Sequence, residues 1–169
     1  MIVVCGLTAA QTQIDLHKAK SVISILGPET PHRDFSGIDS ARHLRLTFND
    51  INAHTPGLIS PRSSDAKKLV DFIAAWDQTS PLLIHCWAGI SRSTASAFTA
   101  LCVLHPHVEE MELARQLREA SPSATPNRMI TQQVDEILER EGRMLQAVES
   151  IGRGANAFEG KPFVLNISR

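Results

Sequence analysis

Cys86 and Arg92, a cysteine and an arginine six positions apart, are the residues whose types and spacing predict chemistry most directly. They lie in segment 85–93, which reads His-Cys-Trp-Ala-Gly-Ile-Ser-Arg-Ser and joins an apolar run to a stretch rich in Ala and Ser. The first N–H groups of a helix have no partner within the helix, so a turn from a strand into a helix can enclose a phosphate or another oxyanion. Segment 85–93 is therefore predicted to be an oxyanion-binding loop.

The start of the predicted helix also acts on Cys86. A thiol at that position beside an arginine ionises readily, so Cys86 is predicted to be largely thiolate near neutral pH and to act as a nucleophile. Arg92 can present its planar guanidinium to two oxygens of one phosphoryl group, and Gly89 allows the tight curl of the backbone. The predicted phosphate-binding residues are Trp87, Ala88, Gly89, Ile90, Ser91 and Arg92.

Segment 85–93 resembles the signature of the cysteine-dependent protein tyrosine phosphatases, His-Cys-x5-Arg followed by Ser or Thr, with Gly in the family's position. The resemblance implies that Cys86 attacks phosphorus and forms a cysteinyl-phosphate intermediate. It implies that Arg92 and the loop amides hold the phosphoryl oxygens, and that neither a metal nor another cofactor takes part. Ser93 would donate a hydrogen bond that helps the cysteine leave, and His85 would support the loop.

A general acid is also required, because the departing oxygen must be protonated. The resemblance implies an aspartate on a loop a few dozen residues before the cysteine. Asp50 lies 36 residues before Cys86 and follows an expected strand, 43–48, at the sheet edge where Cys86 emerges. Asp50 is therefore the predicted acid. Asp34 and Asp39 precede that strand, and Asp65 and Asp71 belong to the next helix.

Segment 125–128, Thr-Pro-Asn-Arg, resembles the family's Pro-Asn element near the active-site rim, so Asn127 is a candidate supporting residue. The alternative is simple helix initiation, with Pro126 at the first helical position and Asn127 in a turn. Trp87 either lines the mouth of the pocket or packs beneath the loop. Cys5 and Cys102 are predicted core residues, although a reversible disulfide with Cys86 is a further hypothesis. No metal site is predicted.

Strands alternate with helices along the chain, which predicts an α/β fold with a mostly parallel central sheet flanked by helices. By the resemblance, this is the phosphotyrosine protein phosphatase-like fold of the dual-specificity type. Strands are predicted over 1–5, 21–26, 43–48 and 82–86. Helices are predicted over 64–78 with Ser64 or Asp65 as the cap, and over 91–104, 107–120 and 126–140. Segment 144–151 could prolong the last helix, and 163–167 is either an added strand or an ordered tail.

The chain has 169 residues and a formal net charge of -1, which predicts one domain and no field that would recruit nucleic acid. We expect a catalytic domain over 1–150 and a C-terminal extension or tail, 151–169, packed on it. The apolar runs are too short to span a membrane, and no secretory signal is recognisable, so a cytoplasmic protein is predicted. A monomer is favoured, but the sequence does not fix the oligomeric state.

The predicted function is therefore that of a protein tyrosine phosphatase, with dual specificity as an option, acting on a phosphorylated protein or peptide. One alternative is a phosphatase of phosphoinositides or other small phosphate esters. Such a loop would be expected to carry lysines, whereas Trp87, Ala88 and Ile90 are uncharged. Another alternative is a catalytically idle phosphopeptide-binding module, which would need neither Cys86 nor Asp50.

Overall fold

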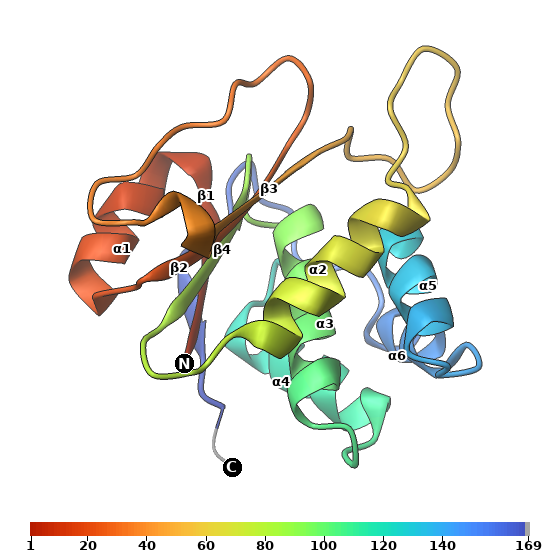
Figure 1. The fold of residues 1–169 in the computed structure, drawn as a ribbon. Coiled ribbons are helices and arrows are strands. Elements are labelled where there is room, and N and C mark those ends of the chain that lie inside the picture. The colour runs from red at the N-terminus through yellow and green to blue at the C-terminus, as the bar shows by residue number, and fades with distance from the viewer. Residues whose placement is uncertain (168–169) are drawn as a thin grey trace.

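A five-stranded sheet with the order β3-β2-β4-β1-β5 lies at the centre of the computed structural model, which describes residues 1–167 (Figure 1). Its strands are β1 (Ile2–Gly6), β2 (Ser21–Leu26), β3 (His43–Thr47), β4 (Leu82–Cys86) and β5 (Phe163–Leu165). The first four are mutually parallel, and β5 pairs antiparallel with β1 at the edge. Strands β1, β2 and β4 are buried along their whole length, which explains their nearly continuous apolar sequences. The predicted fold class is confirmed.

Helices cover both faces of the sheet (Figure 1). One face carries α1 (Ala10–His17), preceded by the short 3-10 helix Leu7–Ala9; another 3-10 helix, Ser40–Arg42, leads into β3. The other face carries α2 (Ser63–Ala75), α3 (Arg92–Leu104), α4 (Glu110–Ala120), α5 (Arg128–Ile137) and α6 (Arg143–Ile151). Helix α3 is rich in Ala, Ser and Thr and is buried over most of its length, because small side chains let it lie close to β1, β2 and β4. It extends directly from the loop after Cys86.

Two predicted helix starts are wrong by a few residues. Helix α2 begins at Ser63 with Arg62 as its N-cap, so neither Ser64 nor Asp65 is the cap. Asp65 acts instead from the third helical position, where its carboxylate accepts the backbone N–H of Arg62 at 2.9 Å. Helix α4 begins at Glu110 rather than at residue 107.

The late helices also differ from the prediction. Helix α5 begins at Arg128 with Asn127 as its N-cap, so Pro126 precedes the helix rather than filling its first position. Segment 144–151 does not prolong α5 but lies in α6, a separate helix. The chain turns between them through left-handed conformations at Glu139, Glu141 and Gly142. Of the two alternatives predicted for segment 163–167, an added strand or an ordered tail, the strand is confirmed for part of the segment, which forms β5.

The parallel strands bring the predicted site residues to one edge of the sheet. Register pairs Leu26 with Thr47 and Gly6 with Cys86, so β3 and β4 end at the same side. Asp50 follows β3 shortly after its last residue, and Cys86 is the last residue of β4. This confirms the reasoning that placed the carboxylate and the thiol at a common edge.

The segment after α6, residues 152–162, runs back beside the loop that follows β4. The Gly154 N–H donates to Thr125 Oγ1 at 3.2 Å, and the Gly160 N–H donates to the Ala88 carbonyl at 2.8 Å. The predicted C-terminal extension, 151–169, is described as far as residue 167, and residues 168–169 lie outside the described part of the chain.

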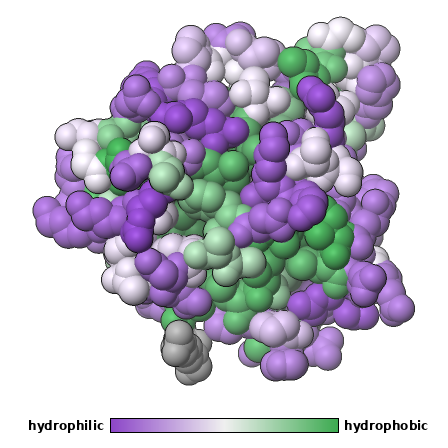
Figure 2. All heavy atoms as spheres, in the orientation of Figure 1, coloured by the Kyte–Doolittle hydropathy of each residue, from purple (hydrophilic) through white to green (hydrophobic). Residues whose placement is uncertain are grey.

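Hydrophilic side chains form most of the outline of the molecule in the orientation of Figure 1, and hydrophobic ones are seen mainly inside that outline (Figure 2). Among the residues that the structure describes, five large hydrophobic side chains are exposed: Leu16, Leu58, Ile59, Trp87 and Phe158. Within residues 1–167, no helix combines the length and the apolar character needed to cross a membrane.

Arg118 of α4 fixes the turn that precedes the 152–162 segment. Its Nη1 donates to the Ile151 carbonyl at 2.7 Å, and its Nη2 donates to the carbonyls of Ala124 and Gly152 at 2.7 and 2.9 Å. We expect Arg118→Met to lower the free energy of unfolding by about 2 kcal/mol, because it removes charged hydrogen bonds and keeps most of the stem. Urea denaturation measures the change. Arg118→Lys should recover only part of it, and equal stability of Arg118→Met and wild type would contradict this role.

Candidate active site

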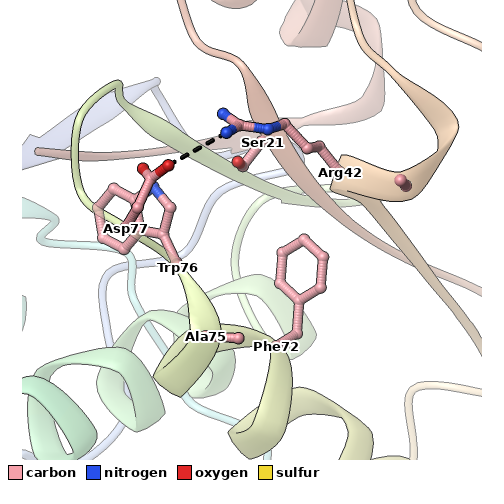
Figure 3. Close-up of a pocket in the computed structure, with 7 residues that line it drawn as sticks. Ser21, Arg42, Phe72, Ala75, Trp76 and Asp77 are labelled. Atoms are coloured by element: carbon pink, nitrogen blue, oxygen red, sulfur yellow. Dashed lines mark hydrogen bonds and ion pairs between the residues drawn. The ribbon is translucent and has the colours of Figure 1, made fainter.

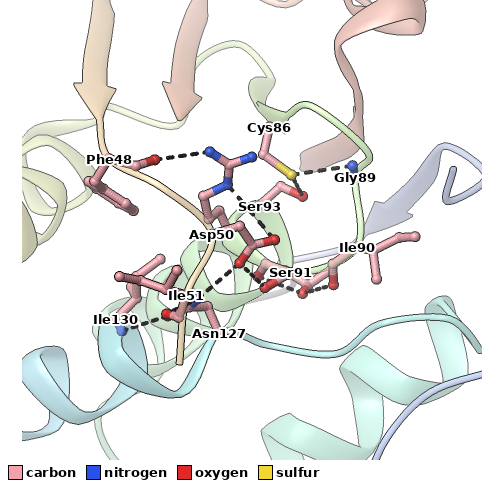
Figure 4. Close-up of polar contacts among 12 residues, drawn as sticks. Phe48, Asp50, Ile51, Cys86, Gly89, Ile90, Ser91, Ser93, Asn127 and Ile130 are labelled. Carbon is pink, nitrogen blue, oxygen red and sulfur yellow. Dashed lines mark hydrogen bonds and ion pairs between the residues drawn. The ribbon is translucent and has the colours of Figure 1, made fainter. Parts of the chain in front are cut away.

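The loop from β4 to α3 curls around the sulfur of Cys86, which is 1% exposed. The Gly89 N–H donates to Sγ at 3.2 Å, and Ser93 Oγ lies 3.1 Å from Sγ (Figure 4). When the sulfur is a thiolate, the Ser93 hydroxyl becomes a donor to it. The Gly89 N–H and the Ser93 hydroxyl are thus both placed to donate hydrogen bonds to a negatively charged sulfur.

The loop turns its carbonyl groups outward and its N–H groups inward. Four carbonyls accept backbone N–H groups from neighbouring segments: Trp87 from Leu7 (3.0 Å), Ala88 from Gly160 (2.8 Å), Ile90 from Thr125 (2.9 Å) and Ser91 from Asn127 (3.2 Å). A trans peptide points its C=O and the following N–H in opposite directions. The N–H groups that follow these carbonyls therefore face the centre of the loop, as an oxyanion site requires.

Gly89 is needed for this curl. Its φ is +72°, and a Cβ at this position would lie 2.7 Å from both the carbonyl carbon of Cys5 and the nitrogen of Gly6. The loop is therefore pressed against the end of β1, and any side chain at residue 89 would push it away.

Arg92 is 6% exposed and reaches back toward the end of β3. Its Nη1 donates to the Phe48 carbonyl at 3.0 Å. Its Nε is buried and, within residues 1–167, makes no hydrogen bond, although Asp50 Oδ2 lies 4.0 Å away. Buried N–H groups in proteins almost always have a partner, so an unsatisfied one beside the loop fits a bound oxyanion.

Asp50 lies across from Cys86 and is held through one of its two oxygens. Oδ1 accepts from Ser91 Oγ at 2.6 Å and from Asn127 Nδ2 at 3.0 Å (Figure 4). The side chain is 38% exposed, so the carboxyl group can meet both substrate and water.

Asn127 serves two purposes, which unites the two sequence interpretations. Its Oδ1 accepts the N–H of Ile130 at 3.1 Å and caps α5. Its Nδ2 donates to Asp50 and to the Ile51 carbonyl, the latter at 2.9 Å. One side-chain amide therefore both caps α5 and holds the Asp50 carboxylate.

His85 points to the opposite face of the sheet from α3. Its Nε2 lies 2.6 Å from Ser24 Oγ, and its Nδ1 lies 3.1 Å from the Cys86 carbonyl oxygen. Trp87 does not pack beneath the loop: it is 47% exposed and its ring meets that of Phe158 edge to face, with the ring centres 5.6 Å apart.

The other two cysteines are buried, as predicted, and neither forms a disulfide. Burial raises the pKa of both the Cys5 and the Cys102 thiol to about 12. Within residues 1–167, no group of three or more His, Cys, Asp or Glu side chains is arranged to hold a metal ion.

Sequence reasoning missed the residues that brace the loop from outside. Thr8 Oγ1 donates to the Glu159 carboxylate, and a Cβ at Gly160 would lie 2.8 Å from the Gly89 carbonyl oxygen. The first contact joins side chains that are 151 residues apart in sequence, and the second depends on backbone atoms, so neither leaves a local residue-type pattern. The glycines of segment 152–160 were the only feature of the sequence that could have indicated a close approach of this segment to the loop.

A pocket of about 160 Å³ lies at the opposite edge of the sheet (Figure 3). It lies between the starts of β2 and β3 and the end of α2, and an ion pair between Arg42 and Asp77 (3.1 Å) lies along it. Because β4 carries Cys86 at the other edge, this pocket is separate from the candidate site.

No protein-family model and no curated protein sequence matches the chain. Solved structures do match it. DUSP15 has 22% sequence identity over 89% of both chains, with a TM-score of 0.62. The human tyrosine phosphatase-like serine/threonine/tyrosine-interacting protein has 18% identity over 83% of this chain and 92% of its own, with a TM-score of 0.64.

PTPMT1, in complex with PI(5)P, has 14% identity over 89% of this chain and 92% of its own, with a TM-score of 0.57. The chain therefore has the fold of the dual-specificity phosphatases, and the predicted fold type is confirmed.

We expect Gly89→Ala to weaken binding of orthovanadate at least about tenfold, or ~1.4 kcal/mol, because the new Cβ displaces the loop from β1. Isothermal titration calorimetry measures the affinity. Gly37→Ala is the matched control, since Gly37 also has positive φ (79°) but no atom within 4 Å of an added Cβ. Both variants should lose about 1 kcal/mol of stability to the positive φ, and Gly89→Ala should lose more because of its close contacts with β1. Equal vanadate affinity in both would contradict the close approach as the cause.

Proposed function

We propose that the protein is a cysteine-dependent phosphatase of the protein tyrosine or dual-specificity type, which hydrolyses phosphomonoesters on protein side chains. The observation that carries this proposal is the arrangement around Cys86: inward N–H groups, the unsatisfied Nε of Arg92, and Asp50 across the loop. A nucleophile, an oxyanion site and an acid are the three parts that phosphoryl transfer through a thiolate needs.

In the first step, the phosphoryl oxygens accept hydrogen bonds from the loop N–H groups and from Arg92. The Cys86 thiolate attacks phosphorus, so that an S–P bond forms while the ester P–O bond breaks. The leaving oxygen takes a proton from Asp50. Both hydrogen bonds to Asp50 go to Oδ1, which leaves Oδ2 as the oxygen that carries this proton.

In the second step, a water molecule attacks phosphorus while the Asp50 carboxylate takes its proton. The S–P bond breaks, inorganic phosphate forms, and the sulfur leaves as a thiolate. Gly89 and Ser93 stabilise that thiolate through the contacts of 3.2 and 3.1 Å already present at the sulfur. The proton taken from this water returns Asp50 to its protonated form, so that departure of phosphate completes the cycle.

The surroundings of the loop favour a single phosphate on a protein side chain. The loop residues between Cys86 and Arg92 are uncharged, so none would pair with further phosphates of a headgroup. The ring of Trp87, a loop residue, and the ring of Phe158 that it contacts are exposed and offer an apolar surface to a phosphotyrosine ring or to neighbouring peptide side chains. The phosphoinositide in the PTPMT1 complex makes phosphoinositides the alternative that a substrate panel must include.

The decisive experiment is hydrolysis of an aryl phosphate with a metal chelator present. Wild type should be active and indifferent to the chelator, and Cys86→Ser should lose about 10³-fold or more, because the nucleophile is removed. Cys102→Ser, which changes a buried cysteine of α3 away from the loop, is the control. Phosphotyrosine and phosphothreonine peptides should be turned over faster than phosphoinositides.

Two results would contradict this proposal. Loss of activity with the chelator would indicate metal-dependent hydrolysis. Binding of phosphopeptide with no turnover of any substrate would instead identify a phosphopeptide-binding module.

We expect Asp50→Asn to reduce kcat about 10²- to 10⁴-fold while phosphopeptide affinity stays nearly unchanged, because the amide accepts the same hydrogen bonds but donates no catalytic proton. The loss should grow as the leaving group becomes more basic. Asp71→Asn on α2, whose carboxylate pairs with Lys67 at 2.7 Å, is the matched control. Equal rates for Asp50→Asn and wild type on an ester with a poor leaving group would exclude Asp50 as the acid.

A further inference from the structure

Three polar side chains from neighbouring strands meet on the sheet face opposite α3. Ser24 of β2 lies between His43 of β3 and His85 of β4, with its Oγ 2.7 Å from His43 Nε2 and 2.6 Å from His85 Nε2. Ser24 is 1% exposed, His43 8% and His85 0%. Buried polar groups must be hydrogen-bonded to be tolerated, so the placement of the hydrogens in this cluster is constrained.

Only one placement of hydrogens satisfies every contact when both imidazoles are neutral. The Cys86 carbonyl can only accept, so His85 Nδ1, 3.1 Å away, carries the ring hydrogen and His85 Nε2 is an acceptor. The Ser24 hydroxyl must then donate to His85 Nε2. Because Ser24 has one hydrogen, its oxygen accepts from His43, whose hydrogen is therefore on Nε2.

The surroundings keep both rings neutral. Burial, followed by Arg45, His85 and His32, lowers the pKa of His43 to about 4, and Asp34 acts weakly in the other direction. Burial also lowers the pKa of His85 to about 4; the Cys86 carbonyl opposes this, and His32 and Arg33 add to it. The ring of Phe35 covers both imidazoles, at 5.5 Å from His43 and 5.4 Å from His85 between ring centres.

We propose that Ser24 and His43 are positioning residues, which hold His85 in its Nδ1–H tautomer and thereby fix the backbone of the nucleophile. With the hydrogen on Nε2 instead, the Nδ1 lone pair of His85 would face the lone pairs of the Cys86 carbonyl. The peptide after Cys86 begins the loop, so a change in its orientation would move the N–H groups that serve the sulfur and the oxyanion.

The consequence for turnover rests on the proposed function, but the tautomers and the thiol can be measured without a substrate. In ¹⁵N NMR spectra at pH 7, wild-type His85 should be the Nδ1–H tautomer and His43 the Nε2–H tautomer. In Ser24→Ala, the His85 shifts should move toward those of a mixture of tautomers. An unchanged Nδ1–H tautomer in Ser24→Ala would overturn the proposal.

The second readout is the pH dependence of alkylation by iodoacetamide. Burial raises the pKa of the Cys5 and Cys102 thiols to about 12, so these two thiols stay protonated below pH 9 while alkylation is followed at Cys86. We expect Ser24→Ala and His43→Phe to move the midpoint upward by about 0.5 to 1 pH unit, or to slow alkylation below the midpoint ~3- to 10-fold. An unchanged profile in both would overturn the proposal.

His43→Gln is the matched control, because a glutamine amide can donate to Ser24 from nearly the position of His43 Nε2. It should keep the alkylation rate within about twofold of wild type. If the residues act through one chain of hydrogen bonds, Ser24→Ala combined with His43→Phe should be no worse than Ser24→Ala alone. Additive effects would show that they act separately. If Ser24→Ala fails to fold, the two His43 variants still decide the question.

These outcomes separate the two proposals. Predicted tautomers and shifted alkylation in a protein without phosphatase activity would contradict the proposed function and leave the positioning role intact. An active phosphatase whose alkylation profile is unchanged by substitution of Ser24 and of His43 would contradict the positioning role alone.

Discussion

The candidate site depends on one constraint: the carbonyl groups of the loop after Cys86 are held from outside. Three neighbouring segments supply four backbone N–H groups, from Leu7, from Gly160, and from Thr125 and Asn127. Loss of any of these bonds would free a peptide to rotate, and a rotated peptide would point a carbonyl at an incoming anion. The oxyanion site is therefore a property of the packing around the loop as much as of the loop sequence.

Hydrogen bonds from neighbouring segments also join Asp50, the proposed acid, to the loop. Asn127 donates its backbone N–H to the Ser91 carbonyl and its side-chain amide N–H to Asp50, while the Ser91 hydroxyl donates to Asp50 directly. The position of the Asp50 carboxylate is thus fixed relative to both the start of α5 and the loop itself. A displacement of α5 would move the acid and the oxyanion site together.

The sequence predicted a mostly parallel sheet, four of its strands, most of the helices, and the cluster of Cys86, Arg92, Asp50, Ser93 and Asn127, because each depends on local pattern or on motif spacing. It was wrong about helix starts. Arg62 rather than Ser64 or Asp65 is the N-cap of α2, and Asn127 rather than Pro126 directly precedes the first residue of α5, since several polar residues near a helix start can satisfy the same free N–H groups. The contacts of Gly160 and the meeting of Ser24 with His43 could not be predicted, because they join residues that only the tertiary fold brings together.

The hydrogen bond between Gly160 and Ala88 couples the conformation of the chain after α6 to that of the loop after Cys86. Most of segment 152–162 is exposed, so its contacts are of the kind that open well before a buried sheet does. Opening would release the Ala88 carbonyl while leaving the core intact. On warming, the affinity of the site for an oxyanion would then fall at temperatures below the main unfolding transition. The anchoring of segment 152–162 would therefore set the highest temperature at which the site can bind an oxyanion.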